Sequence, residues 1–581
     1  MSRSDLSDPT GREIVAPGTE ILWDAGSLLD ARSASDRVIY TALPDGSGSG
    51  FNRLDFTGAN VATLEPYLQD VQGDDGDLIE FVRGVGRDWK LGDINHSNPV
   101  VIGPPSGTPT QMGAGYDAFK LAWEDRPKVL YVGANDGMLH CFDVFTGQEL
   151  WGFIPYNLLP RLKNMWGVDP ITLDRFFVRD VYVDGSPVVA DVMLGGNWKT
   201  ILICGQGSGK GSVIGGGTNY YFALDVTDPE NPLPLWELTH TAMGETWSVP
   251  LIGKVTKDGA DAWVGFVGSG YDNNADVGVV LGNVLYAVDL EDGSIFWTFA
   301  ADEIDTSDPA RTNDQFPNIQ NTLPGSASSV DIDRNGYMDR VYIGDLDGRV
   351  WKVDVTPEFE NTGSWDAVAL YVDPDNYPII TEPAIWRNPA GAAVDPRVFF
   401  GTGGDDGAPN DATYSFVALI DREATSEIEW YLGVPGGIRT AERDAGDLAV
   451  GEKVWADPKI EDYTVYFSTL TGSIEAVDPC LNLAGLGKLY ARFIISMGGS
   501  PVGGTAFKGL SGAMESLDLA IKTRSAVTLG ETQTTTDGVR KREVYIQEYD
   551  STVQKLEQLT GGLLKIKSWR EIYKVLKIIG T

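Results

Sequence analysis

One stretch of nine residues carries the strongest signal for chemistry in this 581-residue chain. Its first, third, fifth and ninth positions hold carboxylate or amide side chains, namely Asp331, Asp333, Asn335 and Asp339. Gly336 at the sixth position permits a sharp turn, and the backbone carbonyl of Tyr337 at the seventh supplies a further oxygen. Alternating oxygen ligands in a tight turn converge on one hard cation, and without a cation these carboxylates would repel one another. The segment therefore predicts a Ca²⁺ site with the ligands Asp331, Asp333, Asn335, Tyr337 and Asp339.

The length of this segment separates it from the commonest calcium loop. A twelve-residue EF-hand loop ends on a bidentate glutamate, and Tyr342 stands at that position here. The segment matches instead the shorter nine-residue loops found between propeller strands. An ordinary aspartate-rich β-turn is the alternative. A calcium site of this kind is expected to have an affinity anywhere from about micromolar to millimolar.

Other groups of reactive residue types give weaker signals. The acidic stretch 272–276 has ligand types but poor spacing, so we expect a solvated loop. The stretch 205–211 lacks both the first glycine and the Ser or Thr of a phosphate-binding loop, which argues against nucleotide binding. The three histidines and three widely spaced cysteines favour neither a zinc site nor a disulfide framework. No catalytic constellation stands out, and we expect a protein that is not an enzyme.

A repeated phrase predicts the elements that position the nine-residue loop. Residues 139–151 and 285–297 both fit Asp-x-x-x-Gly-x-x-x-Trp. Asp and Gly supply a tight turn between two strands, and Trp packs against the neighbouring unit. Looser copies extend the pattern, with successive anchors 57 to 82 residues apart at Asp143, Asp225, Asp289, Asp354, Asp421 and Asp478. Repeats of this length, each a small antiparallel sheet, are typical of a β-propeller.

Composition agrees with a chain of many short strands and limits its partners. The 16 tryptophans and 69 glycines suit strands joined by turns and argue against a helical protein. The net charge of −38 argues against nucleic acid as a partner, because phosphate binding needs a basic surface. No stretch reaches the ~20 apolar residues that a membrane-spanning helix needs, so we expect no transmembrane segment.

We divide the chain into four segments and expect an all-β fold. They are a polar lead-in arm (1–36), the start of the propeller or a connecting segment (37–127), the propeller core with the loop 331–339 (128–500), and C-terminal strands and a helix that close or cap the fold (501–581). Short helices are expected at 21–31 and 77–83, and isolated strands at 37–41 and 100–102. The lead-in arm is interpreted as a remnant of a missing N-terminal region.

Several segments resemble, in the same order along the chain, the propeller region of the PilY/PilC family of type IV pilus biogenesis factors and tip adhesins. The most similar are 331–339 and 341–354, and the others are 92–100, 129–143, 183–191, 221–229 and 247–250. Together they cover about residues 20–500. The resemblance implies a modified seven-bladed, quinoprotein-like propeller. It also implies that the calcium site at 331–339 influences pilus extension against retraction.

The resemblance further implies where the protein acts and with which partners. It places the protein in the cell envelope, at the pilus tip or on the outer surface. The implied partners are minor or major pilins and the pilus assembly machinery, with a host or surface ligand in addition. Full-length members of the family carry a signal peptide and a large N-terminal half. Residues 1–13 lack the order of a signal peptide, so we expect this chain to be N-terminally truncated.

Two other functions stay open beside a calcium-binding, non-enzymatic propeller that supports pilus assembly or extension and surface attachment. The Asp-x-x-x-Gly-x-x-x-Trp phrase also occurs in PQQ-type quinoprotein dehydrogenases. Those enzymes carry a vicinal pair of cysteines, which this sequence lacks, and their calcium draws ligands from several blades. The third function is that of a periplasmic scaffold propeller of the outer-membrane assembly type.

Overall fold

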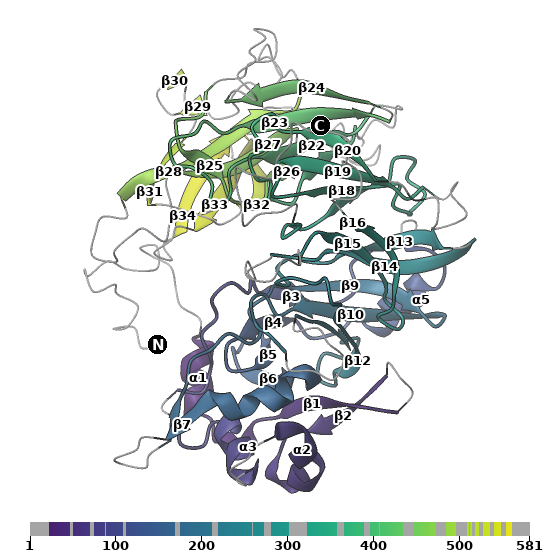
Figure 1. The fold of residues 1–581 in the computed structure, drawn as a ribbon, viewed down its shortest axis with the longest axis vertical. Coiled ribbons are helices and arrows are strands. Elements are labelled where there is room, and N and C mark those ends of the chain that lie inside the picture. The colour runs from purple at the N-terminus through teal and green to yellow at the C-terminus, as the bar shows by residue number, and fades with distance from the viewer. Residues whose placement is uncertain are drawn as a thin grey trace, which may run out of the picture.

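The computed structural model describes most residues between 23 and 559, and the longest stretches outside the description are 301–321, 434–446, 472–483 and 496–507. Strands dominate, and small sheets follow one another along the chain (Figure 1). The described helices are short: α1 (Ala25–Ala31), α2 (Val61–Leu68), α3 (Asp75–Arg83), α5 (Tyr116–Ala122), and the 3-10 helices η1 (Ala34–Asp36), η2 (Gly58–Asn60) and η3 (Tyr156–Met165). None of the described helices has the length and hydrophobicity that a membrane-spanning helix needs.

The first sheet has six strands in the order β2-β1-β6-β5-β4-β3. Its strands are β1 (Ile39–Pro44), β2 (Phe51–Asp55), β3 (Val100–Ile102), β4 (Val129–Ala134), β5 (Met138–Asp143) and β6 (Glu149–Ile154). β3 to β6 form an antiparallel unit, and β1 extends it by pairing parallel with β6. Residues 37–127 thus contribute three strands to the first sheet. A two-stranded sheet of β7 (Trp166–Val168) and β8 (Arg175–Phe177) follows.

Four sheets of four antiparallel strands come next. The second sheet has β9 (Pro187–Leu194), β10 (Asn197–Gly205), β11 (Tyr221–Asp225) and β12 (Leu233–Leu238). The third has β13 (Leu251–Lys257), β14 (Ala260–Gly268), β15 (Val284–Asp289) and β16 (Ile295–Ala300). The fourth has β17 (Ser328–Val330), β18 (Arg340–Gly344), β19 (Arg349–Asp354) and β20 (Ala367–Val372). The fifth has β21 (Ala384–Trp386), β22 (Arg397–Gly401), β23 (Phe416–Arg422) and β24 (Thr425–Leu432).

The C-terminal strands build two further sheets and a small hairpin. The sixth sheet has β25 (Glu452–Val454), β26 (Lys459–Glu461), β27 (Thr464–Thr471), β28 (Ala484–Phe493) and β31 (Leu517–Ile521). The last sheet has β32 (Thr528–Thr534), β33 (Arg540–Gln547) and β34 (Val553–Leu559), and the hairpin has β29 (Lys508–Gly509) and β30 (Gly512–Ala513). The C-terminal helix expected within 501–581 lies outside the described residues. The chain is therefore a β-propeller, as predicted, and its seven-blade count stays a prediction.

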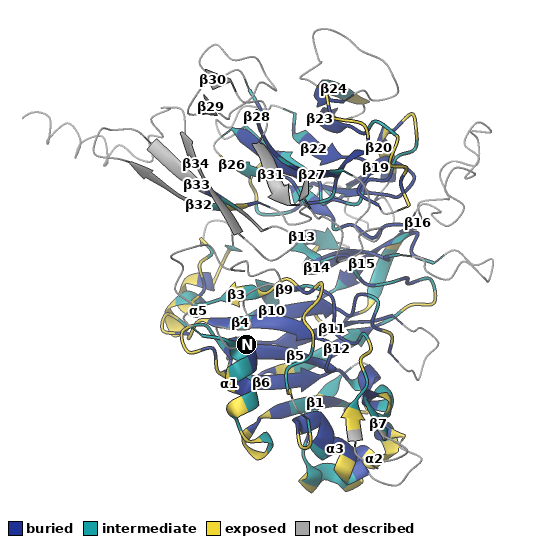
Figure 2. Ribbon diagram, turned by 90° about the vertical axis from the view of Figure 1, so that its left-hand side faces the viewer, coloured by how far each residue is buried: buried dark blue, intermediate teal, exposed yellow. Residues whose placement is uncertain are grey.

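The hydrophobic core lies between neighbouring sheets rather than at one centre. Six clusters of buried side chains join the sheets in sequence, first to second, second to third, and so on to the last. Figure 2 shows the buried colour following the strands through the stack. A four-stranded sheet cannot bury both of its faces alone, so each sheet depends on its neighbours for stability.

The repeated phrase forms the contact between sheets that its residue types predict. At the β15–β16 turn, Asp289 accepts the N–H of Glu291, and Gly293 adopts a left-handed φ of 75°. The indole of Trp236 in the second sheet covers this turn and donates to the carbonyl of Leu290 at 3.0 Å. A Cβ on Gly293 would lie 2.7 Å from Cγ of Trp236, so a larger residue would push the indole away. Trp236 thus joins the second sheet to the third.

A buried charge network ties the N-terminal arm to the first sheet. Glu149 on β6 accepts two hydrogen bonds from Arg37, at 2.9 and 2.8 Å. His140 on β5 lies between two carboxylates, 2.9 Å from Glu149 and 3.1 Å from Asp136. Asp136 also accepts the N–H of Gly92. All these side chains are buried, so each charge depends on its partners.

The carboxylates set the charge of the histidine in this network. Burial alone would lower the pKa of His140, but Asp136 and Glu149 outweigh burial and raise that pKa to about 9. Burial likewise opposes ionisation of Glu149, yet Arg37 and His140 lower the pKa of Glu149 to about 2. Both groups are therefore charged at neutral pH.

We predict that the protein loses stability as the pH rises from about 6.5 to about 9. A raised histidine pKa stabilises the folded state fully below the unfolded value of about 6.5, and this contribution disappears as the pH passes the folded value. The loss should be on the order of 3 kcal/mol in urea unfolding. The His140→Gln variant should show no such decline in this window, and an equal decline in the variant would contradict the assignment to His140.

Candidate metal centre

The nine-residue loop connects β17 to β18 in the fourth sheet. Carboxylate oxygens of Asp331, Asp333 and Asp339 all lie within 4.8 Å of one another. Asp333 is exposed, Asp331 is half-buried and Asp339 is buried. This is the one group of three acidic, histidine or cysteine side chains within the described residues that could hold a metal ion. Its members are the three aspartates that the sequence predicts as ligands.

Hydrogen bonds within the loop arrange these carboxylates. Asp331 accepts the N–H groups of Arg334, Asn335 and Gly336 at 2.6, 3.1 and 2.9 Å. Arg334 and Gly336 have left-handed φ values of 67° and 91°, and these tighten the turn. Asn335 donates from its amide to Asp333 and accepts the N–H of Tyr337. The structure thus gathers all five predicted positions into one turn, and Ca²⁺ itself stays a prediction.

The crowding of negative charge is visible at Asp339. Burial and then the charges of Asp333 and Asp331 raise the pKa of Asp339, although the N–H of Ile332 opposes this shift by donating to it. A divalent cation would compensate this repulsion, and carboxylate and amide oxygens are the ligands that Ca²⁺ prefers.

The third sheet supports the loop from one side. The hydroxyl of Tyr337 donates to Asp261 at 2.6 Å, and Lys254 binds Asp261 at 2.7 Å. The Lys254 ammonium also lies 4.0 Å from the centre of the Tyr337 ring. Met338 fits against Gly253, and its N–H donates to the carbonyl of Lys254 at 2.8 Å. Four contacts therefore connect the loop to β13 and β14.

The fifth sheet supports the loop from the other side. Arg387, directly after β21, donates to the backbone carbonyls of Asp331 and Ile332. Directly after the loop, Arg340 pairs with the buried carboxylate of Asp421 at the end of β23. Asp421 also binds Lys352 at 3.1 Å, so two cations of the fourth sheet bind this carboxylate of the fifth. The loop belongs to the fourth sheet, and contacts with the third and fifth sheets hold it in place.

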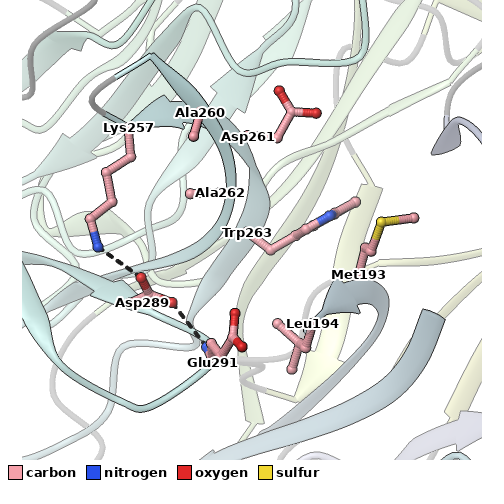
Figure 3. A pocket seen from close by; sticks show the side chains of 9 residues that line it. All are labelled: Met193, Leu194, Lys257, Ala260, Asp261, Ala262, Trp263, Asp289 and Glu291. Carbon is pink, nitrogen blue, oxygen red and sulfur yellow. Dashed lines mark hydrogen bonds and ion pairs between the residues drawn. The ribbon is translucent and has the colours of Figure 1, made fainter. Parts of the chain in front are cut away.

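A pocket of about 270 Å³ lies next to this supporting region (Figure 3). Its lining residues are Met193, Leu194, Lys257, Ala260, Asp261, Ala262, Trp263, Asp289 and Glu291. Lys257 and Asp289 form an ion pair at 2.8 Å, and Asp261 is engaged by Lys254 and Tyr337. The pocket therefore holds charged side chains that largely neutralise one another, and we assign no reaction to it.

Sequence reasoning missed the residues that support the loop. Asp261 and Lys254 precede the loop by about 70 residues, and Arg387 follows it by about 50. They belong to other sheets, and no spacing pattern near them in the sequence indicates that they contact the loop. The second acidic stretch, 272–276, lies outside the described residues.

Comparisons with known proteins agree with this architecture. A sequence model of the PilY1 beta-propeller domain matches residues 91–368. The type IV pilus biogenesis factor PilY1 of Pseudomonas aeruginosa (strain UCBPP-PA14) is 31% identical over 364 residues, which are 58% of this chain and 28% of that protein. A PilY1 homolog of Xylella fastidiosa is 29% identical over 442 residues, 72% of this chain and 31% of that protein.

A solved structure gives the same fold. The crystal structure of the Pseudomonas aeruginosa PilY1 C-terminal domain has a TM-score of 0.53 and 20% sequence identity, and the match covers 80% of this chain and 99% of that one. The chain spans less than a third of the length of the curated relatives named above. The sequence and fold matches coincide on the propeller, which is therefore similar in sequence to the PilY1 beta-propeller domain and has the fold of the PilY1 C-terminal domain.

Proposed function

We propose that the chain is a calcium-binding, non-enzymatic propeller that supports type IV pilus assembly or extension and surface attachment. Its place is the cell envelope, at the pilus tip or outer surface. Its partners are pilins and the assembly machinery, with a host or surface ligand in addition. The relatives are named as pilus biogenesis factors, which supports a pilus-related role. The observation that carries the calcium proposal is the convergence of three carboxylates within 4.8 Å.

Calcium would act on the contacts between sheets. With the cation bound, repulsion among Asp331, Asp333 and Asp339 turns into common attraction to one charge, and the turn becomes rigid. The same turn presents the Tyr337 hydroxyl to the third sheet and the Asp331 carbonyl to the fifth. Occupancy of the loop would therefore strengthen the connection among three sheets, and a partner bound across them would sense calcium.

The position of the proposed ligands also argues against the quinoprotein function. All five proposed ligands belong to one hairpin of one sheet. A calcium ion that bridges a quinone would take ligands from several blades. This difference favours a structural or regulatory cation over a catalytic one.

We expect wild-type protein to bind Ca²⁺ at one saturable site in titration calorimetry. The variant Asp331→Ala/Asp333→Ala should lose this site while keeping the propeller fold, because core packing between sheets supplies most of the stability. The matched control is Asp272→Ala/Asp276→Ala, which removes two carboxylates of poor ligand spacing and should retain the site. No saturable binding by wild type, or equal binding by the first variant, would contradict the calcium proposal.

A second prediction concerns Asp339→Asn in chelator. The substitution removes one charge from the crowded loop, and its amide oxygen can still accept the N–H of Ile332. Without calcium we expect the variant to be more stable than wild type, by roughly 0.5–1 kcal/mol in urea unfolding. In calcium at 100 times the dissociation constant, wild type should gain about 2.7 kcal/mol and the variant less. A variant that is less stable in chelator would show that the carboxylates do not repel one another.

The pilus role is tested by complementation. In a piliated bacterium whose own PilY1-type gene is deleted, a full-length gene that carries this propeller should restore surface pili in calcium-containing medium. The Asp331→Ala/Asp333→Ala version should restore fewer pili or none at equal protein level. Equal restoration by both versions would separate the pilus role from calcium.

A further inference from the structure

The N-terminal arm carries a tryptophan contact that duplicates the contact between sheets. The indole N–H of Trp23 donates to the carbonyl of Val144 at 2.8 Å. Val144 directly follows Asp143, the anchor of the first sheet, just as Leu290 directly follows Asp289 in the third. The donors differ, because Trp236 comes from the preceding sheet and Trp23 comes from the arm before the first sheet.

The steric details of the two contacts also agree. Gly147, four residues after Asp143, has a left-handed φ of 69°, and Gly293 has 75°. A Cβ on Gly147 would lie 2.6 Å from Cγ of Trp23, against 2.7 Å between Gly293 and Trp236. The turn of the first sheet thus holds an indole in the same position and with the same hydrogen bond.

The strands that end the chain's described part, β26 to β34, have no tryptophan that could take this position. The chain has no tryptophan between Trp455 and Trp569, so β26 to β34 contain none. Among the described residues, the six buried clusters connect sheets in sequence, and none of them joins the last sheet to the first. Figures 1 and 2 show α1 beside β6, and Figure 1 shows β32 to β34 beside the sixth sheet.

Other contacts hold the same arm along the first sheet. Arg32 donates to the carbonyl of Glu149 at 2.6 Å, and Arg37 pairs with the Glu149 side chain. β1 then pairs with β6 in parallel at three register positions. Indole, guanidinium and strand contacts therefore follow one another along residues 23–44.

We propose that residues 23–44 form a strap that takes the place of a preceding sheet on the first sheet. In this arrangement the first sheet is completed by the strap and does not depend on the last sheet. Within the described part of the chain, the last and first sheets then share no tryptophan contact like the one between the second and third sheets. The strap would stabilise the fold through its own contacts with the first sheet, and these contacts do not involve calcium.

Hydrogen exchange of the full chain, followed by mass spectrometry, tests the strap. Trp23→Ala should raise the exchange rate of residues 143–149 at least tenfold and leave residues 289–293 unchanged. Trp236→Ala is the matched control and should show the reverse pattern. Trp23→Phe keeps an aromatic ring but loses the N–H donor, so we expect an intermediate change at 143–149. Unchanged exchange at 143–149 in Trp23→Ala would overturn the proposal.

Two further measurements keep the test decisive. Added indole should fill the space left in Trp23→Ala and restore slow exchange at 143–149, which a globally misfolded variant would not show. Val544→Ala, which loosens the last sheet against the sixth, should leave 143–149 unchanged. Faster exchange there in Val544→Ala would mean that the last sheet closes onto the first, contrary to the strap.

Discussion

The structure depends on the packing of each small sheet against the next. A sheet of four short strands has two apolar faces and cannot bury them within itself. Six buried clusters between consecutive sheets bury these faces, and the first cluster also includes side chains of α2, α3 and η3. Tryptophans such as Trp236 add direction, because the indole N–H reaches one particular carbonyl in the next turn. Sheets that follow one another along the chain therefore also lie next to one another in the structure.

The loop 331–339 and the proposed N-terminal strap both lie at contacts between sheets. The loop 331–339 lies in one sheet, but its Tyr337 hydroxyl and Asp331 carbonyl are held by the sheets before and after it. The strap offers Trp23 to the first sheet as a preceding sheet would. In both cases a short segment makes the contacts that hold one sheet against its neighbour. A cation bound at 331–339 would therefore influence a wide surface although it binds only one turn.

Local patterns in the sequence predicted the fold and the turn in which three carboxylates come together. The Asp-x-x-x-Gly-x-x-x-Trp phrase revealed the repeating sheets, because its turn and its tryptophan are short-range features. The spacing of Asp331, Asp333 and Asp339 likewise predicted a turn that brings three carboxylates together. Periodicity also indicated the short helix at 77–83, within α3, and the strand at 100–102.

Contacts between distant segments could not be predicted in this way. Asp261 holds Tyr337 across 76 residues, and Arg37 reaches Glu149 across 112. Such pairs depend on which sheets become neighbours and in what register, and no spacing in one sequence encodes this. The equivalence of Trp23 to Trp236 was hidden for the same reason, because Trp23 stands outside any copy of the repeated phrase.

The central claim is that calcium at the loop stabilises the junction of three sheets. Hydrogen exchange of the wild-type chain in calcium and in chelator tests it most directly. Calcium should slow exchange at 331–339 together with 253–261 in the third sheet and 384–388 in and directly after β21 of the fifth sheet. Slower exchange confined to 331–339, or no change anywhere, would contradict it.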